Sequence, residues 1–350
     1  MKKLYFLLIA FFFASGAFAQ DVHLSQFYNQ PVMLNPALTG FTPGKARINI
    51  SYRNQWFSAT HDGLFRPPYM TTALGAELPI SIKRDVLGVG LLIANDQAGA
   101  NTFTTVITQA SVAYIKTLGR DENHRLSAGF QIGYTYQSIK TVDFQFYNQF
   151  DQTNQFQSTM SSNEDLSKTK VGYLNLNFGL VWYGKLSDHF GMYLGGSFYN
   201  VTTPKYNILP NQKRDLYWRA NVHTGLDIKI GDKSHILPSI MYMQQGVNNQ
   251  LNTGLGFGYD LNDDMALTIG CYNRVNPHKK INNWIGTNGD AVIPYAAFEI
   301  KGFKIGITYD ATISKLKQSG SGVGSFELML GYTIRGRDYD DRNSLVTPRF

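Results

Sequence analysis

The sequence predicts an all-β protein, a transmembrane β-barrel of about fourteen antiparallel strands with a short ordered N-terminal segment. Three observations support this fold class. Charged residues make up only 16% of the chain, against roughly 25% in a typical soluble domain, while aromatic residues reach 14%. Apolar and polar residues alternate along many segments, as they do when successive side chains point to opposite faces of a strand. Several segments span about 13 to 17 residues, far more than the roughly 5–6 of soluble strands.

The start of the chain has the pattern of a secretory signal peptide over residues 1–19. A basic start precedes an apolar run over residues 4–14, and a small-x-small pattern predicts cleavage between Ala19 and Gln20. A retained membrane anchor is the alternative. No later apolar run approaches the roughly 20 residues that a membrane-spanning helix needs. We therefore expect the mature chain outside the cytoplasm, with no nucleic acid as a partner.

Fourteen segments fit the strand pattern, and their alternation assigns residues to the two faces of the barrel wall. We expect these segments at about 45–57, 69–78, 86–96, 102–117, 124–140, 170–184, 189–201, 215–231, 235–246, 249–260, 264–276, 291–300, 303–314 and 323–335. Lipid-facing positions should include Phe130, Ile132, Leu176, Phe178, Val222 and Ile228, and interior positions Gln131, Asn177, Asn221 and His223.

The connections between these segments favour an outer-membrane barrel, because short turns alternate with longer loops such as those near 58–68 and 141–169. Closure follows from physical chemistry, since an open sheet edge in lipid would leave unpaired backbone groups. An even strand count places both termini in the periplasm. Aromatic residues suited to the membrane interfaces are Trp56, Trp182, Tyr183, Trp218 and Tyr332. The predicted organisation is a signal peptide (1–19), a turn-rich segment at the periplasmic mouth (20–44), the barrel (45–335) and a periplasmic tail (336–350).

Two motifs stand at the start of the predicted barrel. The stretch from Ser25 to Gly40 reads SQFYNQPVMLNPALTG, and residues 53–56 read RNQW within the first strand. This pairing resembles the PorP/SprF family, in which S-Q-x-x-x-x-P-x-x-L-N-P-A-x-x-G precedes R-N-Q-W. The chain's final Pro-Arg-Phe is also similar, although Thr347 stands where members often have a cysteine. The motif residues are Ser25, Gln26, Phe27, Asn35, Pro36 and Gly40, followed by Arg53, Asn54, Gln55 and Trp56.

The resemblance implies a non-enzymatic outer-membrane component of the type IX secretion system. It implies periplasmic secretion subunits as partners, including a peptidoglycan-associated protein. It also implies a large secreted adhesin-like protein as cargo, exported or anchored at the cell surface, and a link to gliding motility. For the stretch from Ser25 to Gly40, two interpretations remain open: a plug or strand lead-in that stabilises the barrel, or a surface that contacts a partner.

The chain carries no recognisable catalytic motif, because it lacks a G-x-S-x-G elbow and an H-E-x-x-H pair. Cys271 is its single cysteine, so a thiolate zinc site is excluded. We therefore predict no enzyme activity, no metal and no cofactor. Two other function classes remain open: a passive porin or small-solute transporter, and a barrel enzyme acting at the outer rim.

Charged and glycine residues on the polar strand faces give two further expectations. The basic residues on these faces either line a cationic lumen or pair internally with residues such as Asp227 and Glu299, and we favour internal pairing. They are Arg47, Arg53, Arg219 and Lys229. The glycines at 254, 256 and 258 share one strand face, where they either let another backbone approach or mark loose packing in the lumen.

Overall fold

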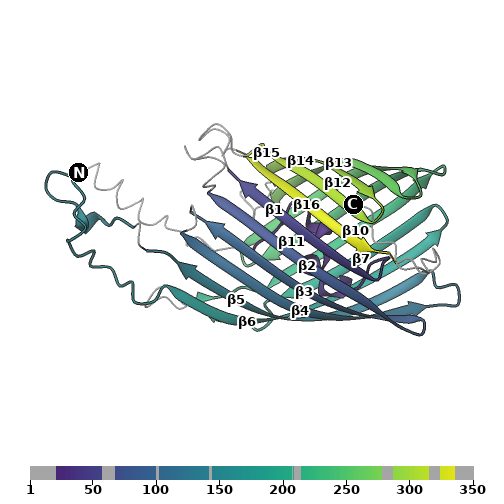
Figure 1. Ribbon diagram of the computed structural model, residues 1–350, viewed down its shortest axis with the longest axis horizontal. Helices are drawn as coiled ribbons and strands as arrows, with labels where there is room; N and C mark the ends of the chain where they lie inside the picture. Colours follow the sequence, from purple (N-terminus) through teal and green to yellow (C-terminus); the bar gives the residue numbers. More distant parts are fainter. Residues whose placement is uncertain are drawn as a thin grey trace.

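The alternating segments form fourteen strands that close into an antiparallel barrel in the computed structural model of the protein (Figure 1). The structure describes residues 21–56, 68–99, 102–141, 144–206, 208, 214–277, 287–314 and 324–335. The predicted signal peptide, with its cleavage site between Ala19 and Gln20, and the predicted tail lie outside these residues. Among the described residues, no helix is long and apolar enough to span a membrane.

All fourteen predicted strands are confirmed, with ends that differ by a few residues. The barrel strands are β1(Ala46–Gln55), β2(Tyr69–Ile82), β3(Asp85–Ala98), β4(Phe103–Leu118), β5(His124–Ile139), β6(Lys170–Ser187), β7(Phe190–Tyr199), β10(Arg219–Ile230), β11(Ser234–Gln245), β12(Asn248–Asn262), β13(Met265–Pro277), β14(Thr287–Ile300), β15(Phe303–Thr312) and β16(Gly324–Ile334). A separate two-stranded sheet pairs β8(Lys205–Tyr206) with β9(Arg214–Asp215) between β7 and β10.

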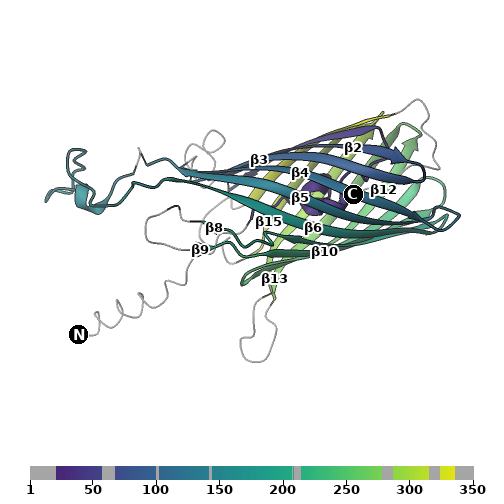
Figure 2. The same ribbon diagram turned by 90° about the horizontal axis from the view of Figure 1, so that it is seen from below.

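The two ends of the barrel differ in their connections. Tight turns join β2 to β3 and β14 to β15 at one end, where β1 also begins and β16 ends. Longer connections lie at the other end, including the β5–β6 loop with η3(Tyr147–Gln149), which projects beyond the barrel, and the β8–β9 sheet (Figures 1 and 2). We call these the short-turn end and the long-loop end. In outer-membrane barrels the short turns are periplasmic and the long loops extracellular.

The barrel wall has an apolar outer face and a polar inner face, which confirms the predicted alternation. Gln131, Asn177, Asn221 and His223 are buried inside the barrel. Phe130, Ile132, Phe178 and Val222 are exposed on its outside, and Leu176 and Ile228 are partly exposed there.

The prediction that Tyr183 lies at a membrane interface is wrong. Tyr183 points inward, with its ring 5.9 Å from that of Phe41, because its neighbour Trp182 lies on the outer face and adjacent strand residues face opposite ways.

Barrel closure joins the first strand to the last. Every residue of β1 has a partner on β16, from Ala46 opposite Ile334 to Gln55 opposite Ser325. This pairing removes the free sheet edges, as a bilayer demands. It also places the residues near the end of β1 beside those near the start of β16, although they are far apart in sequence.

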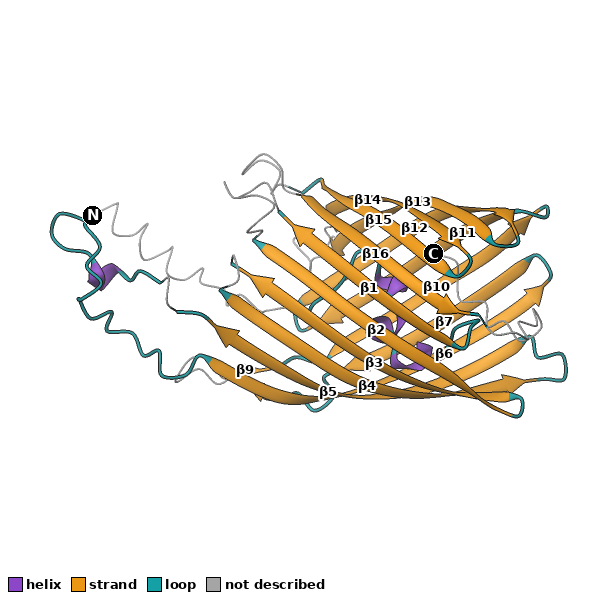
Figure 3. Ribbon diagram, viewed as in Figure 1, coloured by secondary structure: helices purple, strands orange, loops and turns teal. Residues whose placement is uncertain are grey.

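The residues before β1 lie inside the barrel, where Figure 3 shows their helical turns in purple. We call residues 21–45 the lumen segment. It contains η1(Phe27–Asn29), α2(Pro31–Leu34) and η2(Pro36–Leu38). Pro31 and Pro36 begin α2 and η2, because the fixed φ of proline suits the first helical position and its missing N–H is not needed there. Asn35 caps η2, since its side-chain oxygen accepts a hydrogen bond from the Ala37 N–H at 2.9 Å.

Candidate functional site

The lumen segment is enclosed by the barrel along most of its length. Its motif residues Ser25, Gln26, Phe27, Asn35, Pro36 and Gly40 are all buried. The sequence predicted a segment at the periplasmic mouth. Residues near Gly40 do lie toward the short-turn end, but Ser25 lies much deeper, beside residues near the long-loop end. The segment takes this path because the inner wall offers hydrogen-bond partners along its length.

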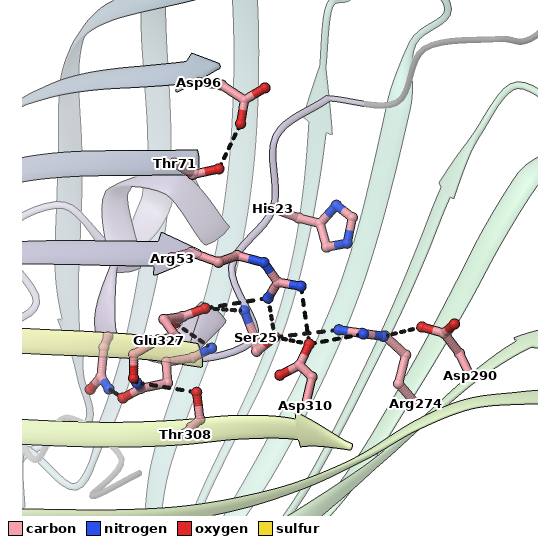
Figure 4. Close-up of polar contacts among 12 residues, drawn as sticks. His23, Ser25, Arg53, Thr71, Asp96, Arg274, Asp290, Thr308, Asp310 and Glu327 are labelled. Atoms are coloured by element: carbon pink, nitrogen blue, oxygen red, sulfur yellow. Dashed lines mark hydrogen bonds and ion pairs between the residues drawn. The ribbon is translucent and has the colours of Figure 1, made fainter. Parts of the chain in front are cut away.

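The first anchor of the segment is the carboxylate of Glu327 on β16 (Figure 4). The backbone N–H groups of Ser25 and Gln26 donate to its two oxygens, each at 2.8 Å. The Ser25 hydroxyl donates to the carboxylate of Asp310 on β15 at 2.8 Å. Since Glu327 is fully buried, these bonds replace the water that an isolated carboxylate would require.

Two arginines neutralise these acids. Arg53 of β1 donates to the Ser25 hydroxyl and pairs with Asp310 at 3.0 Å and with Glu327 at 3.4 Å. Arg274 of β13 pairs with Asp310 at 2.9 Å and with Asp290 at 2.6 Å. The cluster therefore joins strands from both ends of the chain to the lumen segment, and it links the two sequence motifs through Ser25 and Arg53.

His23 lies at the same end of the lumen segment (Figure 4). Burial lowers its pKa from 6.5 to about 3, and the positive charges of Arg53, Arg274 and Arg219 add to this effect. Arg219 pairs with Asp21 of the segment at 3.4 Å. The imidazole is therefore neutral at physiological pH.

The other residues of the RNQW motif have different surroundings. Asn54 is buried on the face of β1 opposite Arg53. Gln55 lines a cavity inside the barrel, and Trp56 packs edge-to-face against Tyr69, with ring centroids 5.2 Å apart. Within the described part of the chain, Arg53 is the residue of this motif whose side chain hydrogen-bonds the lumen segment.

The middle of the segment is anchored through Asn35. Its side-chain amide nitrogen lies 3.2 Å from the Leu180 carbonyl, 3.0 Å from the Gly196 carbonyl and 3.0 Å from His223 Nε2. These groups come from three neighbouring strands, β6, β7 and β10. Asn35 is fully buried, so its amide has no access to water as an alternative partner.

Glycines in the wall allow this close approach. A Cβ at Gly129 would lie well inside van der Waals contact with the backbone of Pro36 and Ala37, and one at Gly179 would overlap the Asn35 side chain. The Ser127 hydroxyl, on the same face of β5 as Gly129, donates to the Ala37 carbonyl at 2.6 Å. A wall with side chains at these glycines could not hold the segment in this position.

The segment is also fixed where it nears the short-turn end. The Gly40 N–H donates to Glu77 at 2.7 Å, and Glu77 in turn pairs with Arg47 at 2.6 Å. Gly40 has a φ of +73°, a conformation that glycine adopts without steric cost. A Cβ at Gly88 would collide with the Thr39 carbonyl, so this glycine also makes room for the segment.

An aromatic cluster packs against the first helical turn. Tyr28 stacks on Tyr272 with ring centroids 5.6 Å apart, and Phe27 meets the same ring edge-to-face at 5.6 Å. Gly254 and Gly256 leave room for the rings of Tyr272 and Tyr295. Gly254 and Gly256 therefore make room for tyrosine rings rather than for another backbone, and these rings contact Tyr28 of the segment.

Internal pairing of the basic residues is confirmed for Arg47, Arg53 and Arg219, but the named acidic partners are wrong. Asp227 instead pairs with His235 at 2.6 Å. The actual partners of the arginines are Glu77, Asp310, Glu327 and Asp21. Sequence reasoning missed these acids, although Asp310 and Glu327 each lie on an inward-facing position of a predicted strand.

Cavities lie on both sides of the lumen segment. One of about 350 Å³ lies toward the long-loop end and is lined by Asp21, His23 and Met33 of the segment. Another, of about 110 Å³, lies toward the short-turn end and is lined by Tyr28, Leu38 and other residues. Within the described part of the chain, no group of three or more His, Cys, Asp or Glu side chains is placed to hold a metal ion.

These features define an outer-membrane β-barrel whose lumen is occupied by its own N-terminal segment. Residues 16–332 match the family described as type IX secretion system membrane protein PorP/SprF, and the chain belongs to this family. Family and fold together indicate a membrane secretion or channel protein. No curated protein matches the chain in sequence.

Several solved barrels are similar in fold to this chain, and three of them serve as examples. The toluene transporter TbuX of Ralstonia pickettii is 9% identical, with 87% of this chain and 92% of that chain covered and a TM-score of 0.50. CymD, a monoaromatic hydrocarbon channel, is 10% identical over 88% and 93% of the two chains, with a TM-score of 0.51. The deltaS2 mutant of the TodX monoaromatic hydrocarbon channel is 10% identical over 88% and 94%, with a TM-score of 0.50. At these identities the likeness concerns the fold alone.

Proposed function

We propose that the chain is a non-enzymatic component of the type IX secretion system that supports export or surface anchoring of a large adhesin-like protein. The family match over residues 16–332 carries this proposal. Its partners would be periplasmic secretion subunits, including a peptidoglycan-associated protein, and its loss would affect gliding motility. These partners would meet the short-turn end, the side that is periplasmic in outer-membrane barrels.

Within this function, the stretch from Ser25 to Gly40 would act as a plug. Its buried side chains, such as those of Ser25 and Asn35, are already bonded to the wall, so they are poorly placed to contact a partner while the segment is docked. Partner contact would instead involve exposed residues at the short-turn end, such as Lys45, Arg120 and Lys233. A lumen filled in this way also argues against a passive porin, which needs an open water-filled channel.

A gene deletion with complementation tests the proposal. Loss of the gene should abolish surface display of a large adhesin, and the wild-type gene should restore it. The double variant Arg120→Glu/Lys233→Glu should reduce co-purification of the periplasmic subunits. Lys168→Glu, a charge reversal at an exposed position of the β5–β6 loop, is the matched control at the opposite end.

Normal adhesin display in the deletion strain would contradict the secretion role. Large, stable conductance of the wild-type barrel in planar bilayers would instead favour the porin interpretation. Equal loss of the subunits with the control variant would show that the effect does not depend on the short-turn end.

A further inference from the structure

The cavity of about 350 Å³ at the long-loop end has the size and lining of a small-molecule binding site. Its volume lies at the small end of the roughly 300–1,000 Å³ typical of small-molecule sites. The lumen segment contributes its floor through His23 and Met33, and the walls come from β1 to β7, β10 and the β8–β9 sheet. Some lining residues also anchor the segment, since Arg219 pairs with Asp21 and the Tyr199 hydroxyl donates to the Met33 carbonyl.

Aromatic rings form much of the cavity wall. They belong to Tyr69, Phe103, Tyr173, Tyr199 and Tyr206. The rings of Tyr173 and Tyr206 lie 5.9 Å apart, and the Arg219 guanidinium lies 4.1 Å above the ring of Tyr199. The Tyr199 ring is buried beneath Arg219 and its hydroxyl donates to the Met33 carbonyl at 2.9 Å, so the flat apolar faces open to a ligand are those of the other rings.

Neutral polar groups such as Thr105, Gln109 and Gln137 form another part of the lining, beside aliphatic side chains. The carboxylate of Asp96 also faces the cavity and accepts a hydrogen bond from the Thr71 hydroxyl at 2.6 Å. The arginines of the lining are paired with acids, Arg219 with Asp21 and Arg53 with Asp310. Within the described part of the chain, Gln137 Oε1 and Arg219 Nε are buried without a hydrogen-bond partner. Both residues line the cavity and so retain bonding capacity for a ligand.

We infer that this cavity binds an uncharged sugar residue, presented at the cell surface as a free saccharide or as part of a glycan. A pyranose ring has C–H faces that pack on aromatic rings and hydroxyl groups that bond amides and hydroxyls, so it matches both parts of the lining. A hydrocarbon would leave the polar groups without partners, which is unfavourable in a dry cavity. An anion would have to compete with carboxylates already paired to the arginines. The inference does not rest on the secretion role.

Titration of the purified barrel in detergent tests this inference, with glucose, galactose, mannose and N-acetylglucosamine as probes. At typical ligand efficiencies, a single sugar ring should bind with a Kd on the order of 1 mM. Trp56 contacts Tyr69 of the wall, so its fluorescence should report binding. Gln137→Ala and Tyr173→Ala should each weaken binding about tenfold or more, the loss expected for one good polar or stacking contact.

Matched variants separate binding from folding. Tyr173→Phe keeps the ring and should retain most of the affinity. Tyr134→Ala removes the same residue type from the outer face of the adjacent strand β5, and should bind like the wild type. Saturable binding of at least one sugar that follows this order would support the inference. It would be overturned if no sugar binds, if the cavity variants bind as well as Tyr134→Ala, or if toluene binds and none of the sugars does.

Discussion

Replacing Gly129 with alanine should loosen the lumen segment while leaving the barrel intact. The new Cβ would collide with the backbone of Pro36 and Ala37, which cannot rotate away as a flexible side chain can. Overpacking of this kind typically costs about 1–3 kcal/mol. If the whole penalty falls on docking, the ratio of released to docked segment rises by roughly 5- to 150-fold, at 1.4 kcal/mol per factor of ten. The strand itself should tolerate the change, because alanine fits a β-strand at least as well as glycine does.

Conductance in planar bilayers measures the release, since an undocked segment opens the lumen. Gly133→Ala is the matched control, because it lies on the same face of β5 and its Cβ would meet the flexible side chain of Gln109 at 2.8 Å. We expect frequent openings with Gly129→Ala and near-wild-type traces with Gly133→Ala, at equal levels of heat-modifiable barrel. Equal conductance of the two variants would refute the argument that close approach at Gly129 holds the segment in place.

Three further predictions concern charge. Arg53→Ala should destabilise the folded barrel by about 3–5 kcal/mol in urea unfolding, because it leaves buried carboxylates without their partner, whereas Arg84→Ala at an exposed ion pair should change little. Phe178→Arg on the lipid face should cost about 2–4 kcal/mol in the same assay, while Tyr147→Arg, 92% exposed in a loop, should have no effect. The pKa of His23 is about 3 in the docked segment but near 6.5 in a released one, so only the released state gains a proton between these values. Docking should therefore be strongest above pH 6.5 and weaken as the pH falls toward 3. Bilayer conductance of His23→Gln should show a smaller pH dependence, with the remainder due to the carboxylates that anchor the segment.

The strands could be predicted from sequence because membrane barrels leave a strong local signal. Lipid on one side and polar groups on the other impose alternation over long segments, as in β5, where Phe130 and Ile132 face out and Gln131 faces in. The motif residues of the lumen segment could also be identified locally. Their depth in the barrel could not, because it depends on wall glycines such as Gly129 and Gly179, whose role appears only when distant strands enclose the segment.

The prediction of the acidic partners was wrong for a related reason. Pairing of Arg53 was expected from its place on a polar strand face, but its partners Asp310 and Glu327 are more than 250 positions away. They become neighbours through closure of β1 against β16, with β15 next in the sheet. No local pattern encodes which acids closure will bring together, so the choice of Asp227 and Glu299 had no geometric basis.

The anchoring of Ser25 and Gln26 on Glu327 has a consequence for assembly. The earliest residues of the described chain find their acceptor on the last strand, so this contact cannot form until nearly the whole protein has been made. The salt bridges from Arg53 to Asp310 and Glu327 also depend on closure, because they join β1 to β15 and β16. Ser25 thus bonds residues from both ends of the chain, Arg53 of the first strand and Glu327 of the last, once the barrel is closed.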